Sequence, residues 1–274
     1  MEKHFAVIGY PIAHSLSPYM HNAGYQAVGL AAEYQRFAVD PARLGEGVAG
    51  LRALGFSGWN VTIPHKEKII PFLDELTPAA EKAGAVNTVK VIEDGRLIGH
   101  NTDGWGFLRS ISAHMPQVNG KYVVMLGAGG AARGIAAPLA ESGARLCILN
   151  RTPEKAQALA DLLVSYGAEC TWGPLTPGAW MEQADLVIQT TSVGLHGEPL
   201  SFPLSGLNKA ALAVDIIFNP PETQFLREAR GNGCAALNGL GMLLYQGVLA
   251  WEFWLGGAAP VESMEEALRN NTGH

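Results

Sequence analysis

The sequence predicts an α/β protein of two domains. The chain has 274 residues, of which 48% are apolar and 16% are charged, so it is able to bury one large core or two cores of ordinary size. Strand-like segments alternate with helix-like segments, as in βαβ units whose strands pair in parallel. This alternation begins a second time near Gly120, which indicates a second domain.

The first series of segments starts close to the N-terminus. Its apolar patterns predict strands at 5–10, 33–39 and 58–63, and helices at 18–30 and 42–54. Two further strand-like runs flank Glu93-Asp94-Gly95, an arrangement typical of a β-hairpin turn. We expect this series to form a domain of residues 1–102.

The second series opens with a strand at 121–127, a run of glycines and an alanine-rich helix. Further strands are expected at 144–150, 185–190 and 212–218, and helices at 153–167, at 240–255 and from Pro260 onward. We expect a second domain of residues 103–238, followed by C-terminal helices in residues 239–274. The pattern alone leaves open which domain these last helices cover.

The composition argues against several classes of function. The net charge of −6 provides no basic surface for nucleic acid or an anionic membrane, and no run of about 18 apolar residues predicts a membrane-spanning helix. Cys147, Cys170 and Cys234 lie far apart and the histidines show no metal-ligand spacing, so neither a disulfide framework nor a metal site is expected. The first residues lack the layout of a secretory signal, and we expect a cytoplasmic protein.

A dinucleotide-binding motif is predicted at Gly127-Ala128-Gly129-Gly130-Ala131-Ala132. This segment follows a strand, opens a helix and fits the pattern G-x-G-x-x-A. Gly127 permits the tight turn, Gly129 lets the backbone approach a pyrophosphate, and the helix N-terminus supplies N–H donors. A tight turn that only connects strand and helix is the alternative interpretation.

The end of the next strand indicates which dinucleotide is bound. NAD sites usually have Asp or Glu there, whereas this strand ends at Asn150 and continues as Arg151-Thr152-Pro153-Glu154-Lys155. Arg151 and Lys155 suit a 2′-phosphate through charge-assisted hydrogen bonds, and Thr152 suits both that phosphate and the N-cap of the next helix. A capped helix with ordinary surface cations is the alternative, but together with the glycine motif the pattern favours NADP.

Three polar clusters of the first domain are candidates for binding a substrate. They are His14–Pro18 after the first strand, Asn60–Lys66 after the third, and Asn87-Thr88 with Asn101–Asp103. Because ligands bind at the carboxyl ends of parallel strands, we expect the first two clusters to face one crevice. Ser15 and Ser17, just before a helix begun by Pro18, suit a carboxylate, with helix capping as the alternative role.

Lys66 and Asp103 are the candidates for acid–base chemistry. A lone lysine is usually solvated and Asp103 is suited to cap a helix, but a lysine held in a cleft by a carboxylate is able to exchange a proton with a bound alcohol. His65 competes for this role because free imidazole titrates near neutral pH. The proposed pair depends on whether Lys66 reaches Asp103 in the fold.

Eight motifs follow one another in a characteristic order. They are GYPIAHSLSP (9–18), NVTIPHK (60–66), GAVNT (84–88), NTDG (101–104), GAGGAARG (127–134), NRTPEK (150–155), TTSVG (190–194) and GLGMLLYQ (239–246). With them the chain resembles the shikimate dehydrogenase family over nearly its whole length. The resemblance implies reversible, NADPH-dependent reduction of 3-dehydroshikimate to shikimate in aromatic amino-acid biosynthesis. It also implies an N-terminal substrate domain, a Rossmann-like NADP-binding domain and C-terminal helices that return to the substrate domain.

The resemblance further implies roles for residues around the substrate. Ser15 and Ser17 would bind its carboxylate, and Lys66, paired with Asp103, would donate the proton in reduction and accept it in oxidation. His65 lies where other members of the family vary, which argues against it as the catalytic group. The side chains that would bond the carboxylate or ring oxygens are Asn60, Thr62, Asn87, Asp103 and Gln246.

The same resemblance implies roles around the cofactor. Gly127–Ala131 would hold the pyrophosphate and Asn150–Lys155 the adenosine ribose phosphate, while Thr191, the backbone at Ile216 and Gly239 would lie along the nicotinamide half. Two positions depart from the family pattern. Phe218 stands where a tyrosine often contacts the substrate, so we expect ring packing without the phenolic bond. Gln189 stands where an asparagine usually precedes the TTS motif.

Two alternative functions have to be weighed. Quinate/shikimate dehydrogenases are a related type that often uses NAD, but Ser17 and the Asn150-Arg151-Thr152 segment favour a shikimate enzyme that uses NADP. A non-catalytic NADP-binding regulatory module is disfavoured because both Lys66 and Asp103 are present. We expect a small-molecule substrate, no metal, and a monomer or homodimer.

Overall fold

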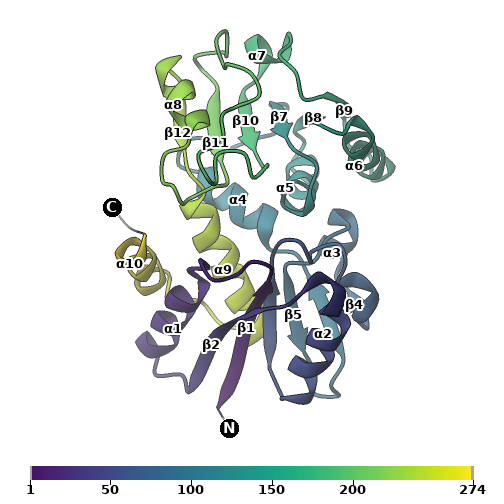
Figure 1. The fold of residues 1–274 in the computed structure, drawn as a ribbon, viewed down its shortest axis with the longest axis vertical. Helices are drawn as coiled ribbons and strands as arrows, with labels where there is room; N and C mark the ends of the chain where they lie inside the picture. Colours follow the sequence, from purple (N-terminus) through teal and green to yellow (C-terminus); the bar gives the residue numbers. More distant parts are fainter. Residues whose placement is uncertain (1, 273–274) are drawn as a thin grey trace. The chain divides into compact units, whose positions relative to one another are not determined.

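A computed structural model describes residues 2–272 of the chain (Figure 1). The chain divides into two compact units. The first contains the described residues up to Gly106 and those from Leu243 onward, and the second is Phe107–Met242. Both divisions fall inside helices, because α4 (Asp103–Ile111) and α9 (Leu240–Leu255) each run from one unit into the other.

The first unit is built on a mixed sheet of six strands in the order β2-β1-β3-β5-β6-β4. The strands are β1 (Lys3–Gly9), β2 (Ala32–Ala38), β3 (Gly58–Val61), β4 (Glu75–Leu76), β5 (Thr88–Val91) and β6 (Leu97–His100). Strands β1, β2 and β3 are parallel, so the segments that follow β1 and β3 leave the same edge of the sheet. The hairpin predicted at Glu93-Asp94-Gly95 is confirmed, because β5 and β6 pair in antiparallel fashion around it.

Helices pack against this sheet. They are α1 (Ser17–Ala27), α2 (Leu44–Ala53), α3 (Pro78–Ala83) and α10 (Val261–Asn271), with short 3-10 turns at Pro41–Arg43 and Ile70–Phe72. The C-terminal helices pack on this first unit: a Cβ added to Gly24 of α1 would touch Trp251 of α9 and Met264 of α10. Tyr25 of α1 stacks on Trp251 with ring centroids 5.0 Å apart, so aromatic side chains join the two ends of the chain.

The second unit is a Rossmann-like sheet in which all six strands are parallel. Its strands are β7 (Tyr122–Leu126), β8 (Arg145–Asn150), β9 (Cys170–Pro174), β10 (Leu186–Gln189), β11 (Leu212–Asp215) and β12 (Ala235–Leu237). The order β12-β11-β10-β7-β8-β9 reverses between β7 and β10, which is the switch point where ligands bind in such sheets.

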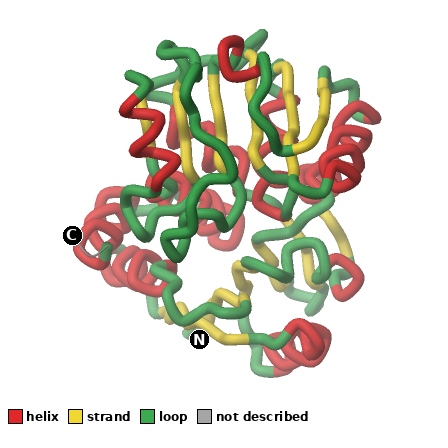
Figure 2. Tube along the Cα trace, turned by 45° about the horizontal axis from the view of Figure 1, so that its top comes forward, coloured by secondary structure: helices red, strands yellow, loops and turns green. Residues whose placement is uncertain are grey.

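Four helices belong to this second sheet. They are α5 (Gly130–Glu141), α6 (Pro153–Ser165), α7 (Trp180–Gln183) and α8 (Gln224–Gly231). Helix α6 packs beside β8 and β9, and α8 packs beside β11 and β12 (Figures 1 and 2). The central strands β7, β10 and β11 are almost entirely buried and apolar up to the last residues of β10 and β11, Gln189 and Asp215, as expected for a parallel sheet covered on both faces.

Several elements differ from the expected pattern. The strand predicted at 58–63 ends at Val61, because the chain turns at Thr62, whose carbonyl accepts a hydrogen bond from His65 N at 2.9 Å. The strand predicted at 212–218 ends at Asp215, and β4, β9 and β12 were not predicted. β4 and β12 have only two and three residues, and β9 (CTWGP) is an edge strand that is mostly exposed, so none of the three carries a clear apolar pattern.

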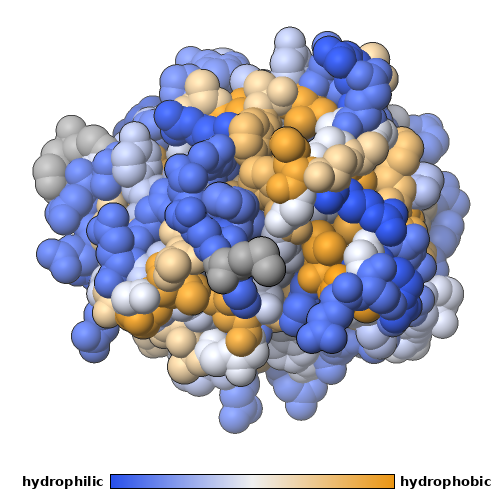
Figure 3. Space-filling view, turned by 90° about the horizontal axis from the view of Figure 1, so that it is seen from below, coloured by the Kyte–Doolittle hydropathy of each residue, from blue (hydrophilic) through white to orange (hydrophobic). Residues whose placement is uncertain are grey.

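Within residues 2–272, no helix has both the length and the apolar composition that a membrane crossing requires. On the face drawn in Figure 3, hydrophobic patches are interrupted by hydrophilic side chains.

Candidate functional site

The first unit brings Lys66 and Asp103 into direct contact. Asp103 is the first residue of α4, and Lys66 lies in the turn after β3, where its carbonyl accepts a hydrogen bond from Val86 N at 2.7 Å. Lys66 Nζ is 2.6 Å from Asp103 Oδ2. Only 9% of Lys66 and 2% of Asp103 is exposed. The pair is therefore a buried ion pair and not a solvated lysine beside a helix cap.

Asn87 holds the other oxygen of the same carboxylate. Its Nδ2 donates to Asp103 Oδ1 at 2.8 Å and to Thr102 Oγ1 at 2.9 Å, while its Oδ1 accepts from Thr102 N at 2.8 Å. Both carboxylate oxygens of Asp103 therefore accept hydrogen bonds. These bonds fix the orientation of the carboxylate and, through it, the position of the Lys66 ammonium group.

Asn60, at the end of β3, belongs to the same buried network. Its Nδ2 donates to Asn87 O and to Thr88 Oγ1, each at 3.1 Å, and its Oδ1 accepts from the hydroxyl of Tyr34 at 2.7 Å. Thr88 belongs to the predicted Asn87-Thr88 cluster, whereas Tyr34 is a member of this network that the sequence motifs did not single out. A tyrosine in a predicted strand is too common to give a signal by itself.

Ser15 lies in the loop between β1 and α1, and Ser17 is the first residue of α1. Helix α1 has Leu16 at its N-cap and no side chain that caps it, so the alternative role of these serines as helix caps is not adopted. Ser17 is buried and its N donates weakly to Ser15 Oγ, at 3.4 Å. Thr62 follows β3, which pairs in parallel with β1. Ser15, Ser17 and Thr62 therefore all lie beyond the same edge of the sheet.

His65 is occupied elsewhere in the first unit. Its Nε2 is 2.8 Å from the carbonyl oxygen of Val39, and its ring is buried. Burial lowers the pKa of His65, and the carbonyl bond opposes this only in part. The imidazole is therefore held as a structural donor to Val39, which leaves Lys66 as the acid–base candidate of this segment.

Gln246 of α9 is placed by a close approach between two helices. A Cβ on Gly106 of α4 would be 2.6 Å from Gln246 N, so only glycine allows α4 to lie so near α9. The side chain is half-buried, and its Nε2 donates to Leu243 O at 2.8 Å.

The glycine motif of the second unit has the geometry of an anion-binding turn. Gly127 has φ +120°, a region that favours glycine, and its Cβ would be 2.5 Å from Thr190 Oγ1. Gly129 is the N-cap of α5, is exposed, and has open space where its Cβ would be. The first N–H groups of α5 are consequently accessible to a phosphate. Ala128, Gly130 and Ala131 are the neighbours of Gly129 in the chain.

The end of β8 presents cations and no acid. Arg151, Thr152 and Lys155 are all exposed, and the half-buried Asn150 uses its Nδ2 to bond Thr152 O at 2.9 Å. Thr152 occupies the N-cap of α6, but its side chain makes no capping hydrogen bond. The expectation that its hydroxyl caps the helix is therefore wrong. The residue is exposed and its hydroxyl accepts no capping hydrogen bond, so it is available to a ligand.

Gln189 replaces the usual asparagine without disordering its loop. Its Oε1 accepts from Thr191 N at 3.1 Å and from Thr191 Oγ1 at 2.9 Å, and Val193 N donates to Thr191 Oγ1 at 3.2 Å. The longer side chain thus still orders the turn after β10.

The loop after β11 is held by an acid that the motifs did not mark. Asp215 accepts hydrogen bonds from Ile217 N at 3.0 Å and Thr223 Oγ1 at 2.7 Å, and burial raises its pKa to about 6. The only sequence signal was a carboxylate at the end of the apolar run LAVD. These bonds fix the backbone at Ile216, where a Cβ on Gly239 would overlap the carbonyl oxygen of Ile216.

Phe218 is half-buried in this same loop. It belongs to the second unit, whereas Ser15, Ser17, Asn60, Thr62, Lys66, Asn87, Asp103 and Gln246 belong to the first.

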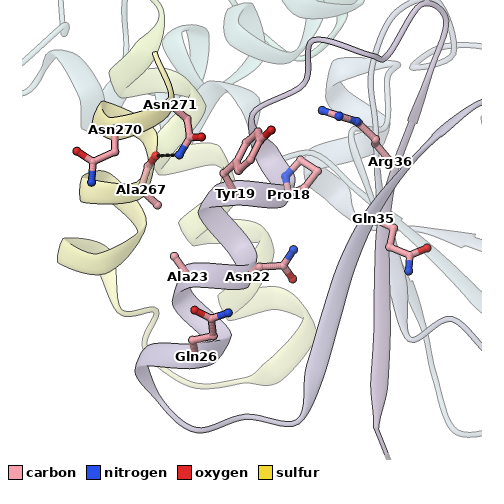
Figure 4. Close-up of a pocket in the computed structure, with 10 residues that line it drawn as sticks. All are labelled: Pro18, Tyr19, Asn22, Ala23, Gln26, Gln35, Arg36, Ala267, Asn270 and Asn271. Carbon is pink, nitrogen blue, oxygen red and sulfur yellow. Dashed lines mark hydrogen bonds between the residues drawn. The ribbon is translucent and has the colours of Figure 1, made fainter. Parts of the chain in front are cut away.

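A separate pocket of about 720 Å³ lies in the first unit over α1, β2 and α10 (Figure 4). Its lining includes Tyr19, Asn22, Gln35, Arg36 and Asn270, and contains none of the expected substrate-binding residues. In the described part of the chain, no group of three His, Cys, Asp or Glu side chains is placed to hold a metal ion.

The chemistry available in the first unit is therefore proton exchange at a buried lysine, beside amides and hydroxyls that suit a small polyhydroxylated acid. The second unit offers a phosphate cradle at a helix N-terminus and cations for a further phosphate.

Comparison with known proteins assigns the chain to a family. Residues 7–89 match the model of the shikimate dehydrogenase substrate binding domain, residues 110–196 that of shikimate / quinate 5-dehydrogenase, and residues 239–269 that of the shikimate 5′-dehydrogenase C-terminal domain. A shikimate dehydrogenase (NADP(+)) of Desulfitobacterium hafniense strain Y51 is 62% identical over 268 residues, which cover 98% of each chain.

Solved structures agree with this assignment. Shikimate 5-dehydrogenase from Thermus thermophilus, in complex with NADP(H) and shikimate, superposes with a TM-score of 0.88 at 38% identity, covering 98% of this chain and 99% of that chain. Quinate dehydrogenase from Corynebacterium glutamicum, in complex with NAD, gives a TM-score of 0.88 at 32% identity, with 98% and 99% covered. Because these family models match and the relative from Desulfitobacterium hafniense is 62% identical over 98% of both chains, the chain belongs to the shikimate dehydrogenase family.

Proposed function

We propose that this protein is an NADP-dependent shikimate dehydrogenase that reduces 3-dehydroshikimate to shikimate reversibly, in aromatic amino-acid biosynthesis. The observation that carries this proposal is the buried contact of 2.6 Å between Lys66 Nζ and Asp103 Oδ2, within a network that includes Asn60 and Asn87. A ketone reduction needs one group that delivers a proton to oxygen, and this network contains such a group in a fixed position.

Lys66 is the proton-transferring residue in this proposal. In the direction of reduction, its ammonium donates a proton to the oxygen of the substrate carbonyl; in oxidation, the neutral amine accepts the proton of the hydroxyl. Asp103 holds Lys66 in place through their ion pair of 2.6 Å. The hydride for the carbonyl carbon would come from NADPH when it is bound.

The remaining polar residues of the first unit orient the substrate. Ser15 and Ser17 are proposed to donate hydroxyl hydrogen bonds to its carboxylate; Ser15 Oγ accepts a hydrogen bond from Ser17 N at 3.4 Å and keeps its own hydrogen for a ligand. The groups proposed for the ring oxygens and the carboxylate are Asn60, Thr62, Asn87, Asp103 and Gln246. Phe218 is proposed to pack against the substrate through its ring, without the hydrogen bond that a tyrosine supplies.

The second unit is proposed to hold NADP(H), and its residues fit this cofactor. Gly127–Ala131 receive the pyrophosphate, which the open space at Gly129 supports. The 2′-phosphate is received by Arg151, Thr152 and Lys155, with Asn150 shaping their loop; their exposure and the absence of an acid at the end of β8 support this. Thr191, the backbone at Ile216 and Gly239 line the nicotinamide half.

The cellular setting follows from the chemistry. A reductive step driven by NADPH depends on the reduced NADPH pool, so we propose a cytoplasmic enzyme that acts on a small molecule. Its assembly is proposed to be a monomer or a homodimer.

Initial rates with each combination of shikimate or quinate and NADP⁺ or NAD⁺ test this function. We expect the highest kcat/KM with shikimate and NADP⁺. A higher kcat/KM with quinate and NAD⁺ contradicts the proposal and supports the related quinate activity. No turnover with any of the four combinations supports a non-catalytic NADP-binding module.

A further inference from the structure

Tyr34 lies at the centre of the buried network of the first unit, although no motif marks it. It is in the middle of β2, and only 1% of its surface is exposed. Its ring stacks on His21 of α1 with centroids 4.4 Å apart and 10° between the planes, and Trp254 of α9 lies at 6.2 Å. This packing leaves the ring one orientation, in which its hydroxyl is 2.7 Å from Asn60 Oδ1.

The partners of Asn60 determine which way its amide points. Asn87 O is a carbonyl oxygen and only accepts hydrogen bonds, so the amide NH2 of Asn60 has to face it. The second amide hydrogen meets Thr88 Oγ1, whose own hydrogen is donated to Asn87 Oδ1 at 2.9 Å. Both donors of Asn60 are thereby used inside the protein.

The oxygen of the Asn60 amide consequently faces Tyr34. Because a carbonyl oxygen carries no hydrogen, Tyr34 is the donor in this bond. The donated hydrogen therefore runs from Tyr34 to Asn60. One lone pair of Asn60 Oδ1 is left for a ligand.

We propose that Tyr34 is a positioning residue that, together with Asn87 O and Thr88 Oγ1, holds Asn60 as a hydrogen-bond acceptor, so that the Asn60 subsite selects a substrate hydroxyl that donates. This inference rests on the proposed function and deepens it. The subsite then rejects a substrate that carries hydrogen, fluorine, a carbonyl or an ether at that position, because none of these donates a hydrogen bond.

The first test uses the unmodified protein with 4-deoxyshikimate, 5-deoxyshikimate and the two corresponding deoxyfluoro compounds. We expect one of the deoxy compounds to lose kcat/KM by about 3- to 10-fold, the effect of one hydrogen bond. The matching fluoro compound should show the same loss, because fluorine accepts but does not donate. Recovery of kcat/KM by that fluoro compound would show that Asn60 presents its NH2 group, and would overturn the proposal.

The second test compares Tyr34→Phe with Tyr25→Phe. Tyr25 is a matched control: it is also 1% exposed, it stacks on Trp251 at 5.0 Å, and its hydroxyl has no hydrogen-bond partner among residues 2–272. For Tyr34→Phe we expect the KM for shikimate to rise by about 3- to 10-fold, with kcat and the KM for NADP⁺ changed by less than about twofold. The ratio of kcat/KM for shikimate to kcat/KM for the sensitive deoxy compound should fall by the same factor.

Tyr25→Phe should leave all of these values unchanged. Equal discrimination in Tyr34→Phe and in the unmodified protein refutes the role of Tyr34. A loss of kcat that parallels a lower thermal unfolding temperature, with discrimination retained, indicates a structural role only and also refutes it. If the unmodified protein does not oxidise shikimate at all, the proposed function itself has failed, which is distinct from these outcomes.

Discussion

Replacing Lys66 by methionine separates its catalytic role from its contribution to stability. The substitution keeps the length of the side chain but removes the charge 2.6 Å from Asp103 Oδ2. Asp103, which is 2% exposed, then keeps Asn87 Nδ2 at 2.8 Å as its side-chain donor and remains a buried carboxylate without a counter-charge. Breaking a buried ion pair in this way costs about 3–5 kcal/mol of the free energy of unfolding.

The turnover number should fall independently of this cost. The loss of a positioned acid–base group typically lowers kcat by about 10²–10⁴-fold. In the double variant Lys66→Met/Asp103→Asn no unpaired charge is buried, so most of the lost stability should return while turnover stays low. Lys68→Met is a matched control, because Lys68 is exposed in the same turn.

Urea unfolding curves measure the free energy of unfolding, and NADPH formation at saturating shikimate and NADP⁺ measures kcat. Equal stability of the single and the double variant would refute the argument from the unpaired carboxylate. A folded Lys66→Met variant that retains kcat within about tenfold would refute the acid–base role. Lys68→Met should match the unmodified protein in both measurements.

Two further predictions concern the cofactor and the response to pH. Arg151→Ala should raise the KM for NADP⁺ by about 10-fold and leave the KM for NAD⁺ unchanged, because a charge-assisted hydrogen bond to the phosphate is lost. The control is Lys209→Ala, which replaces an exposed lysine just before β11 and should change neither KM. An equal rise of both KM values in Arg151→Ala would contradict the phosphate role. Burial lowers the pKa of His21 to about 3, whereas an imidazole in the unfolded chain has a pKa of about 6.5. Between these two values only the unfolded chain binds the proton, so the free energy of unfolding decreases as the pH falls from about 6.5 toward 3. Between about pH 6 and 4, the free energy of unfolding of the unmodified protein should fall more steeply than that of His21→Leu, by about 1.4 kcal/mol per pH unit; parallel curves would contradict the buried neutral imidazole.

Local features of this protein could be predicted from its sequence. The strand–glycine turn–helix at 121–142 depends on residues that are neighbours in the chain, and it formed as expected. The hairpin around Glu93-Asp94-Gly95 and the absence of an acid at the end of β8 are local in the same sense. Turn geometry and the alternation of apolar residues act over a few residues, so the sequence contains what is needed to predict them.

The partners of the polar side chains were decided by tertiary structure. Lys66 and Asp103 are 37 residues apart, and Tyr34 and Asn60 are 26 apart. Asp103 meets Lys66 because α4 begins where β6 ends, next to the turn that follows β3, and Tyr34 meets Asn60 because β2 and β3 both pair with β1. Such contacts depend on strand order, register and helix packing together. The sequence by itself therefore determined which chemical groups are present and which short segments carry them, and the tertiary structure decided which of these groups share a proton or a hydrogen bond.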